Sequence, residues 1–202
     1  NVVYATGVGV FQPTGVVKLA PGDSQLVQLI LIGQQVAVLV DNGDLIDQQF
    51  FHVAADETAE TLYAKHQTAL AQMLERSLAT IARGELPRRP QDPRYATYAA
   101  KRTPGDGLID WNEGAAAIER LVRAVGRPYP GAFTFDGDNR MTIWRSSLLP
   151  DIGMHHAMRG QIVERTEEHL TIMTADGLLK VKEWETASGK TPRQHAVLGR
   201  AR

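Results

Sequence analysis

Short apolar runs, separated by glycine and proline, fill the first 53 residues of the chain. The runs at residues 26–32 and 36–40 have the length of strands, and the second is almost wholly apolar and rich in β-branched side chains. A further strand is expected around residues 48–53. The spacing of these runs therefore predicts β structure over this part of the chain.

Helical spacing replaces this pattern after Asp56. Apolar side chains recur every three or four residues from position 62 to position 81, which predicts one long amphipathic helix. Asp56 or Thr58 can accept backbone N–H bonds at its start. Gly84 and the prolines after it end the helix, and the basic, proline-rich stretch 83–93 has the composition of a linker. We place a domain boundary there.

The C-terminal half predicts a second, shorter helix and then only strands. The helix spans about residues 113–125, and Gly126 and Pro128 end it. Strand patterns separated by turn residues follow at residues 131–135, 141–144, 161–165, 169–174 and 178–184. Five short strands with tight turns predict a small Greek-key barrel of the OB type.

The composition is that of an ordinary soluble globular protein. The 202 residues are 43% hydrophobic and 22% charged, and the formal net charge is -1. This charge gives no general attraction to nucleic acid or to an anionic membrane, and no apolar run approaches the roughly 18 residues of a membrane span. The absence of cysteine excludes disulfides and thiolate metal sites. We therefore expect a cytoplasmic protein without membrane contact.

A tight turn is predicted where Val40 is followed by Asp41, Asn42, Gly43 and Asp44. Asn-Gly between two apolar runs is a strong signal for a hairpin turn. A tight loop can also hold a carboxylate at the end of a strand. The local sequence therefore leaves two interpretations open, a plain hairpin and a functional loop.

The histidines give no comparable signal. His52 alternates with apolar residues in a strand, and His66 lies on the apolar face of the long helix, so we expect both to be packed side chains. His155 and His156 are adjacent, and neighbouring side chains of an extended chain point in opposite directions. We therefore expect no metal site.

Two motifs in the middle of the chain have a characteristic order and spacing. The first is Lys101-Arg-Thr-Pro-Gly-Asp-Gly-Leu-Ile-Asp-Trp111, and the second is Arg127-Pro-Tyr-Pro-Gly-Ala-Phe133. Together they resemble the signature that joins the catalytic and C-terminal domains of folate-dependent formyltransferases. This family includes enzymes that act on methionyl-tRNA and on UDP-4-amino-4-deoxy-L-arabinose.

Two upstream motifs extend the resemblance to about residues 36–202. Asp41-Asn-Gly-Asp44 is similar to the Asp-Thr-Gly-Asp element of the family, with Asn42 in place of Thr. Glu57-Thr-Ala-Glu-Thr-Leu-Tyr63 is similar to the helix start that follows that element.

The resemblance implies an α/β fold in two parts. Part of a Rossmann-like formyltransferase core would be followed by a small OB-like β-barrel. Residues 1–86 would be the C-terminal part of the catalytic domain, residues 87–111 a linker, and residues 112–202 the C-terminal domain.

The resemblance also implies an N-formyltransferase that uses 10-formyltetrahydrofolate. In this family a neutral amine attacks the formyl carbon, and an Asn and a His stabilise the oxyanion. An Asp orients the His and helps the proton leave. Asp41 matches that Asp and would be catalytic. The folate-binding loop would be formed by Val40, Asp41, Asn42 and Gly43.

The acceptor and the completeness of the site stay open at this point. Lys101 and Arg102 are either a solvated linker or contacts to phosphates of the acceptor. The two signature motifs favour a small amine, such as an amino sugar nucleotide or a hydroxyornithine-like siderophore precursor. The alternatives are a methionyl-tRNA formyltransferase, which would bind tRNA, and a non-catalytic module that binds a partner or assembles a homo-oligomer.

The Asn-x-His pair of the family has no counterpart upstream of Asp41, so we expect this sequence to hold one of three catalytic positions.

Overall fold

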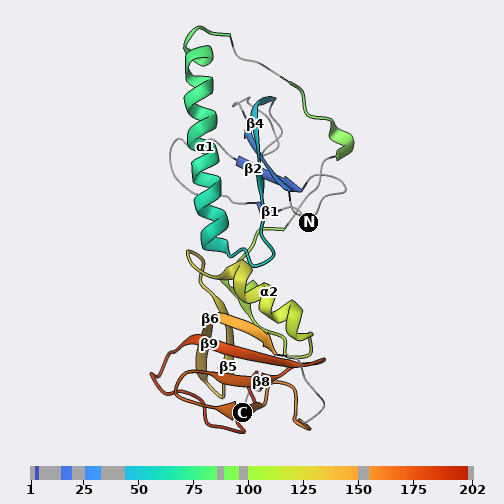
Figure 1. Cartoon of the computed structure of the whole chain (residues 1–202), viewed down its shortest axis with the longest axis vertical. Helices are drawn as coiled ribbons and strands as arrows, with labels where there is room; N and C mark the ends of the chain where they lie inside the picture. The colour runs from blue at the N-terminus through green and yellow to red at the C-terminus, as the bar shows by residue number, and fades with distance from the viewer. Residues whose placement is uncertain are drawn as a thin grey trace. The chain divides into compact units, whose positions relative to one another are not determined.

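The computed structural model describes residues 3–4, 15–19, 26–32, 44–85, 89–95, 100–149 and 155–199 (Figure 1). The chain divides into two compact units, one of Asn1–Glu57 with Thr61–Lys101 and one of Thr58–Glu60 with Arg102–Arg202. The strand predicted at residues 36–40 and the turn after it lie outside the described residues. None of the helices in the described ranges is long and apolar enough to cross a membrane.

The first unit combines an antiparallel sheet with one long helix. Its strands pair in the order β1-β2-β3-β4. They are β1 (Val3–Tyr4), β2 (Gly15–Leu19), β3 (Leu26–Ile32) and β4 (Leu45–His52). The strand predicted at residues 26–32 is confirmed, and the strand predicted at residues 48–53 begins earlier, at Leu45.

The described strand pairs of this unit are antiparallel, whereas a Rossmann-like core is built from parallel strands. The connection from β2 to β3, residues 20–25, is too short for the crossover that parallel neighbours need. The Rossmann-like core is therefore not seen among these strands. The helices and strands together confirm the mixed α/β class.

Helix α1 (Ala59–Ala82) confirms the long helix predicted from the apolar spacing. Gly84 follows it with a φ of 74°, a left-handed conformation that favours glycine at helix ends. Met73 is fully buried and Ala69 is nearly so. They form a small core with the partly buried side chains Ile46, Phe51, Val53, Leu70 and Leu74.

Glu57 fixes the turn that leads into α1. Its Oε2 accepts the N–H of Ala54 at 3.1 Å and also the ammonium group of Lys65. Lys65 donates a further bond of 3.1 Å to the carbonyl of His52. Burial raises the pKa of Glu57, but its hydrogen bonds outweigh burial, so the pKa lies below the usual value.

The second unit packs helix α2 (Ala115–Val125) on a five-stranded antiparallel sheet. Two short 3-10 helices, η1 (Pro93–Tyr95) and η2 (Pro104–Gly107), precede α2 in the chain. The strands are β5 (Ala132–Asp136), β6 (Asn139–Leu149), β7 (Ile162–Arg165), β8 (Leu170–Met173) and β9 (Leu178–Thr186). They pair in the order β5-β6-β9-β8-β7, so β6 to β9 have the strand order of a Greek key.

The core of this unit lies between α2 and the sheet. Ile118 and Val122 are one turn apart on α2, and both are buried. They belong to one apolar cluster with the strand residues Met141, Ile143, Ile162, Leu170, Ile172, Leu179 and Val181. The buried face of α2 therefore supplies core contacts of this unit.

One segment, residues 195–199, bonds to both edge strands of the sheet. The N–H of Ile162 in β7 donates to the carbonyl of Ala196, and the N–H of His195 donates to the carbonyl of Ile162, each at 2.9 Å. The N–H of Gly199 donates to the carbonyl of Phe135 in β5 at 2.8 Å. Among the described strands β5 and β7 do not pair with each other, so this segment links the two edges.

The indole of Trp111 packs beneath this segment. Trp111 is 5% exposed, and its Nε1–H donates to Oγ1 of Thr134 at 3.0 Å. Gly160 and Gly199 lie close to the indole, since a Cβ at these positions would lie 3.1 and 3.0 Å from Trp111 Cδ1. Both glycines also have left-handed φ angles, 80° and 77°. Space and conformation therefore both require glycine here.

Asp176, in the turn between β8 and β9, holds the start of α2. Its Oδ1 accepts the N–H of Ala115, the first residue of the helix, at 2.7 Å. A carboxylate at a helix N-terminus also interacts favourably with the helix dipole. Gly114 lies so close that a Cβ there would collide with the same carboxylate.

We predict that Gly114→Ala destabilises the second unit by about 1–2 kcal/mol, because the methyl group displaces Asp176 and the Ala115 N–H loses its acceptor. Urea unfolding followed by circular dichroism measures this loss. Gly105→Ala is the matched control, since a Cβ there would meet only Oγ1 of Thr103, at 3.5 Å. Equal stability of the two variants would contradict the capping role of Asp176.

Candidate functional site

The predicted catalytic and folate-binding loop lies outside the described residues. This loop comprises Val40, Asp41, Asn42 and Gly43. The described chain resumes at Asp44 and enters β4 at Leu45. The roles assigned to the loop therefore stay predictions, and the structure describes the strand that follows it.

The start of β4 is held by polar contacts on two sides. Leu45 forms an antiparallel bridge with Arg89. The Leu45 N–H donates to the carbonyl of Arg89 at 2.8 Å, and the Arg89 N–H donates to the carbonyl of Leu45 at 3.1 Å. On the other side Asp47 faces α1, where its Oδ2 accepts Nε–H of Arg76 at 2.6 Å. The strand end beside the predicted loop is therefore tied to two further parts of the first unit.

Lys101 and Arg102, the predicted acceptor-binding pair, are both exposed. They lead into η2, whose first turn is fixed by a hydrogen bond of 2.6 Å from the N–H of Thr103 to Oδ2 of Asp106. Exposed cations are compatible with both interpretations of the pair, a solvated linker and a phosphate contact.

The two motifs of the signature lie side by side. Leu108 pairs with Phe133 as a parallel bridge, and the N–H of Ile109 donates to the carbonyl of Phe133 at 2.8 Å. Gly107 approaches Gly131 so closely that a Cβ at Gly107 would lie 2.7 Å from the carbonyl oxygen of Gly131. The glycines of the signature therefore permit a close backbone contact.

Arg127, which opens the second motif, also makes structural contacts. Its guanidinium carbon lies 4.5 Å from the centre of the Trp144 ring. Nη1 donates to Oε1 of Glu183 at 2.9 Å, and Glu185 lies 3.8 Å from Nη2. The hydrogen bond to Glu183 raises the pKa of Arg127. The signature thus contributes packing to the second unit.

The histidines of the first unit occupy different surroundings. His66 stacks on Tyr63 with 6.4 Å between the ring centres, and burial lowers the pKa of His66. His52 is exposed at the end of β4, so only His66 is the packed side chain that we predicted. Within the described residues no group of three His, Cys, Asp or Glu could hold a metal ion.

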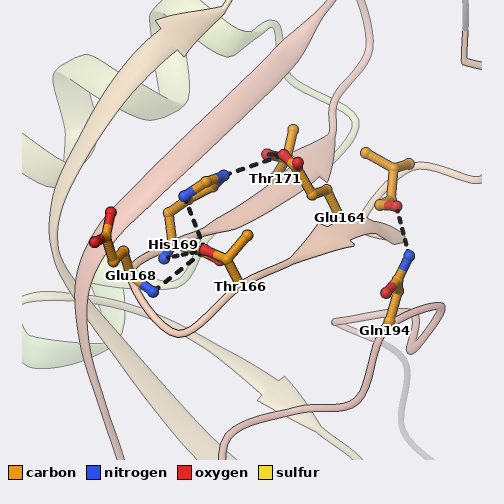
Figure 2. A network of polar contacts seen from close by, with 7 residues as sticks. Glu164, Thr166, Glu168, His169, Thr171 and Gln194 are labelled. Carbon is orange, nitrogen blue, oxygen red and sulfur yellow. Dashed lines mark hydrogen bonds and ion pairs between the residues drawn. The ribbon is translucent and has the colours of Figure 1, made fainter.

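A polar network lies at the turn between β7 and β8 (Figure 2). The sequence pattern gives no signal for it. Nε2 of His169 lies 3.1 Å from Oε2 of Glu164, and Nδ1 lies 2.9 Å from Oγ1 of Thr166. A hydroxyl, an imidazole and a carboxylate in this order are also the parts of a hydrolytic triad. Here, however, Thr166 Oγ1 accepts the N–H groups of both Glu168 and His169, at 3.2 and 3.0 Å. The hydroxyl therefore closes the turn.

Glu164 is the acceptor at the other end of this network. Its Oε2 bonds His169 and also accepts the hydroxyl of Thr171 at 2.9 Å. These two hydrogen bonds lower the pKa of Glu164 below its usual value of 4.5. The network therefore links β7 to β8 most strongly when Glu164 is ionised.

Residues 101–201 match the formyl transferase C-terminal domain family, and this match covers half of the chain. The chain belongs to the formyltransferase family. The match begins at Lys101 and includes both signature motifs, so it confirms the family inferred from them.

Several solved structures share the fold of the chain. HypX from Aquifex aeolicus, in complex with tetrahydrofolic acid, is similar over 78% of this chain and 27% of its own, with a TM-score of 0.61 and 16% identity. The N-formyltransferase from Helicobacter canadensis, in complex with folinic acid and dTDP-3-aminofucose, is similar over 79% of this chain and 56% of its own. Its TM-score is 0.50, and its identity is 16%. The sugar 3N-formyl transferase WlaRD gives a TM-score of 0.51 with the same coverage and identity.

The chain thus spans 27% of HypX and 56% of the two sugar formyltransferases. At 16% identity these likenesses establish the fold alone.

We predict that Glu164→Gln removes a pH-dependent part of the stability of the second unit. The folded-state pKa of Glu164 is depressed, so its contribution is present above the unfolded pKa and is lost as pH falls through the folded pKa. The free energy of unfolding of the wild type should exceed that of the variant at about pH 7, and the difference should shrink below about pH 4.5. Glu167→Gln, an exposed carboxylate in the same turn, is the control. A difference that stays constant down to about pH 3 would contradict the prediction.

Proposed function

We propose that this chain is part of an N-formyltransferase that transfers the formyl group of 10-formyltetrahydrofolate to the amine of a small acceptor. The observation that carries the proposal is the family match over residues 101–201. The likeness in fold to proteins whose structures hold tetrahydrofolic acid and folinic acid supports it.

The reaction forms one bond and breaks one. The neutral amine attacks the formyl carbon, and the bond from that carbon to N10 of the folate breaks when the tetrahedral oxyanion collapses. The amine loses a proton and N10 gains one, so a carboxylate beside the reacting nitrogens can assist the transfer. We assign this role to Asp41, and we assign the contacts to the folate to the loop of Val40, Asp41, Asn42 and Gly43.

The location of Asp41 in the chain supports this assignment. It lies four residues before Leu45, the first residue of β4. Reacting side chains are commonly carried on loops that a rigid scaffold holds in place. Strand β4 pairs with β3 from His52 to Asp47 and again at Leu45, and it packs against α1, so it is suited to this task.

Lys101 and Arg102 are the proposed contacts to the acceptor. Both are exposed, and Arg in particular binds phosphate oxygens through parallel N–H bonds. We therefore favour an acceptor amine that carries phosphate, such as an amino sugar nucleotide. The ligand dTDP-3-aminofucose of the Helicobacter canadensis enzyme is of this chemical type.

The proposal also assigns the domains. Residues 1–86 would form the end of the catalytic domain, residues 87–111 the linker, and residues 112–202 an OB-like C-terminal domain. The Greek key of β6 to β9 supports the last assignment, as does the segment 195–199 that bonds to both sheet edges. The Rossmann-like part of the catalytic core would have to lie outside the antiparallel strands β1 to β4.

A non-catalytic formyltransferase-like module is the second candidate. One observation is compatible with it: the family match covers the C-terminal domain over residues 101–201 and does not include Asp41. Such a module would bind folate or a partner without turnover.

We predict that the intact protein releases tetrahydrofolate from 10-formyltetrahydrofolate when a suitable amine is present. Asp41→Asn should lower kcat by about 100-fold or more, since a general acid–base group accelerates a reaction by at least roughly that factor. The assay follows tetrahydrofolate release with a dTDP-amino sugar, hydroxyornithine and methionyl-tRNA as acceptors. Asp138→Asn is the control, because Asp138 is exposed in the turn between β5 and β6. It should leave kcat unchanged.

The outcomes separate the candidates. Turnover with the dTDP-amino sugar or with hydroxyornithine supports the proposed enzyme, and turnover with methionyl-tRNA alone assigns the other branch of the family. Turnover that Asp41→Asn does not reduce overturns the role of Asp41. Binding of 10-formyltetrahydrofolate without turnover of any acceptor supports the non-catalytic module.

A further inference from the structure

We propose that two cations of α1, Lys65 and Arg76, keep the outer edge of β4 closed to strand pairing, and that a second copy of this chain pairs there when they are removed. This inference concerns the assembly of the protein and goes beyond the proposed transfer reaction. In the order β1-β2-β3-β4, β4 is the last of the described strands, so one of its edges has no neighbouring strand among them. Such an edge is a template for pairing with another chain.

A β-bulge decides which residues of β4 direct their backbone polar groups outward. Leu45 uses its N–H and its carbonyl for Arg89, at 2.8 and 3.1 Å, so both groups point away from β3. The register then moves by one residue on β3, from Ile32 to Leu31, but by two residues on β4, from Leu45 to Asp47. The extra residue shifts the alternation of β4 by one position. The residues that direct their backbone groups outward after the bulge are therefore Gln48, Phe50 and His52.

Side chains cover two of these outward positions. The N–H of Gln48 donates to Oδ1 of Asp47 at 2.7 Å, and the carbonyl of Gln48 accepts Nη2 of Arg76 at 3.3 Å. The carbonyl of His52 accepts Nζ of Lys65 at 3.1 Å. Polar groups that a further strand would use are therefore already bonded within the first unit.

The spacing of the two cations on α1 matches the spacing of the two carbonyls on β4. Lys65 and Arg76 lie on the same face of α1, about three turns and about 16 Å apart. The carbonyls of Gln48 and His52 are about 14 Å apart along an extended strand. One helix face can therefore reach both carbonyls at once.

Carboxylates hold both cations in place. Nε of Arg76 donates to Oδ2 of Asp47 at 2.6 Å, and Lys65 forms an ion pair with Glu57. Each cation thus bonds one carboxylate and one carbonyl of the edge. A strand that pairs at this edge would have to displace both cations, and charged side chains protect edges in this way.

A second copy of the chain is the partner that fits the edge once it is uncovered. Two identical edges can pair antiparallel about a two-fold axis, which brings equal sets of donors and acceptors together. With the axis at Phe50, Gln48 lies opposite the partner's His52. Phe50 is 51% exposed, and the axis places its ring opposite the same ring of the other copy. Aromatic pairs across strands stabilise such pairing.

Removal of the two cations tests the proposal in the full chain. Lys65→Ala/Arg76→Ala frees both edge carbonyls, so this double variant should self-associate at a concentration at least about tenfold lower than the wild type. Analytical ultracentrifugation measures both concentrations. Arg83→Ala/Arg120→Ala is the matched control, because it removes two exposed cations that make no hydrogen bond to β4 in the described structure. The control should associate like the wild type.

A further substitution in the double variant separates backbone pairing from other kinds of association. Phe50→Pro removes the outward N–H at the centre of the edge, and proline is tolerated on an edge strand where its nitrogen faces outward. It should restore the association of the wild type. Phe50→Ala keeps this N–H and removes only the exposed ring, so it should restore it only in part.

Two results with these variants would overturn the proposal. The first is a double variant that associates no more readily than the wild type. The second is association that Phe50→Pro reverses no better than Phe50→Ala, because such association would not use the backbone of the edge.

Hydrogen exchange of the wild-type protein supplies a test that needs no folded variant. The amides of Gln49 and Phe51 face β3 and should exchange at least about tenfold more slowly than the outward amides of Phe50 and His52. Equally slow exchange of all four amides would show that the edge is already paired and would overturn the proposal. None of these measurements depends on formyl transfer, so the proposed function can fail without affecting them.

Discussion

The second unit depends on the packing of one indole ring. Trp111 packs against the segment 195–199, and two left-handed glycines, Gly160 and Gly199, lie so close to it that a Cβ on either would crowd the ring. That segment in turn bonds to β7 and β5, the two edges of the sheet. The ring, its hydrogen bond to Thr134 and the segment therefore hold together strands that do not pair with each other. A side chain of another shape at this position would leave a cavity beneath the segment.

This constraint explains why the signature identifies the family while its described contacts are structural. Trp111 ends the first motif, and Gly107 and Gly131 bring the first motif against the second. Arg127 stacks on Trp144 and pairs with Glu183. Each of these contacts depends on the size and shape of the residue at its position, so the motifs are recognisable in the sequence. The proposed chemistry belongs instead to Asp41, upstream of β4, where the sequence signal is a turn that many proteins share.

Local patterns predicted the regular elements well. The apolar spacing located α1, α2 and five strands of the second unit, because amphipathic periodicity directly reflects which face is buried. Contacts that depend on the folded chain were not predictable. The bridge from Arg89 to Leu45, the network of Glu164 with His169 and the segment 195–199 all join residues whose pairing depends on the folded chain. The expected Rossmann-like core came from the family resemblance, whereas the short connection between β2 and β3 favours antiparallel pairing.

The stability of Trp111→Ala tests the central claim most directly. If the second unit depends on this ring, urea unfolding should show a loss of about 3–5 kcal/mol, the usual range for removing a buried aromatic side chain that leaves a cavity. A loss within about 0.5 kcal/mol, as is typical of surface substitutions, would contradict the claim that Trp111 supports the segment between the sheet edges.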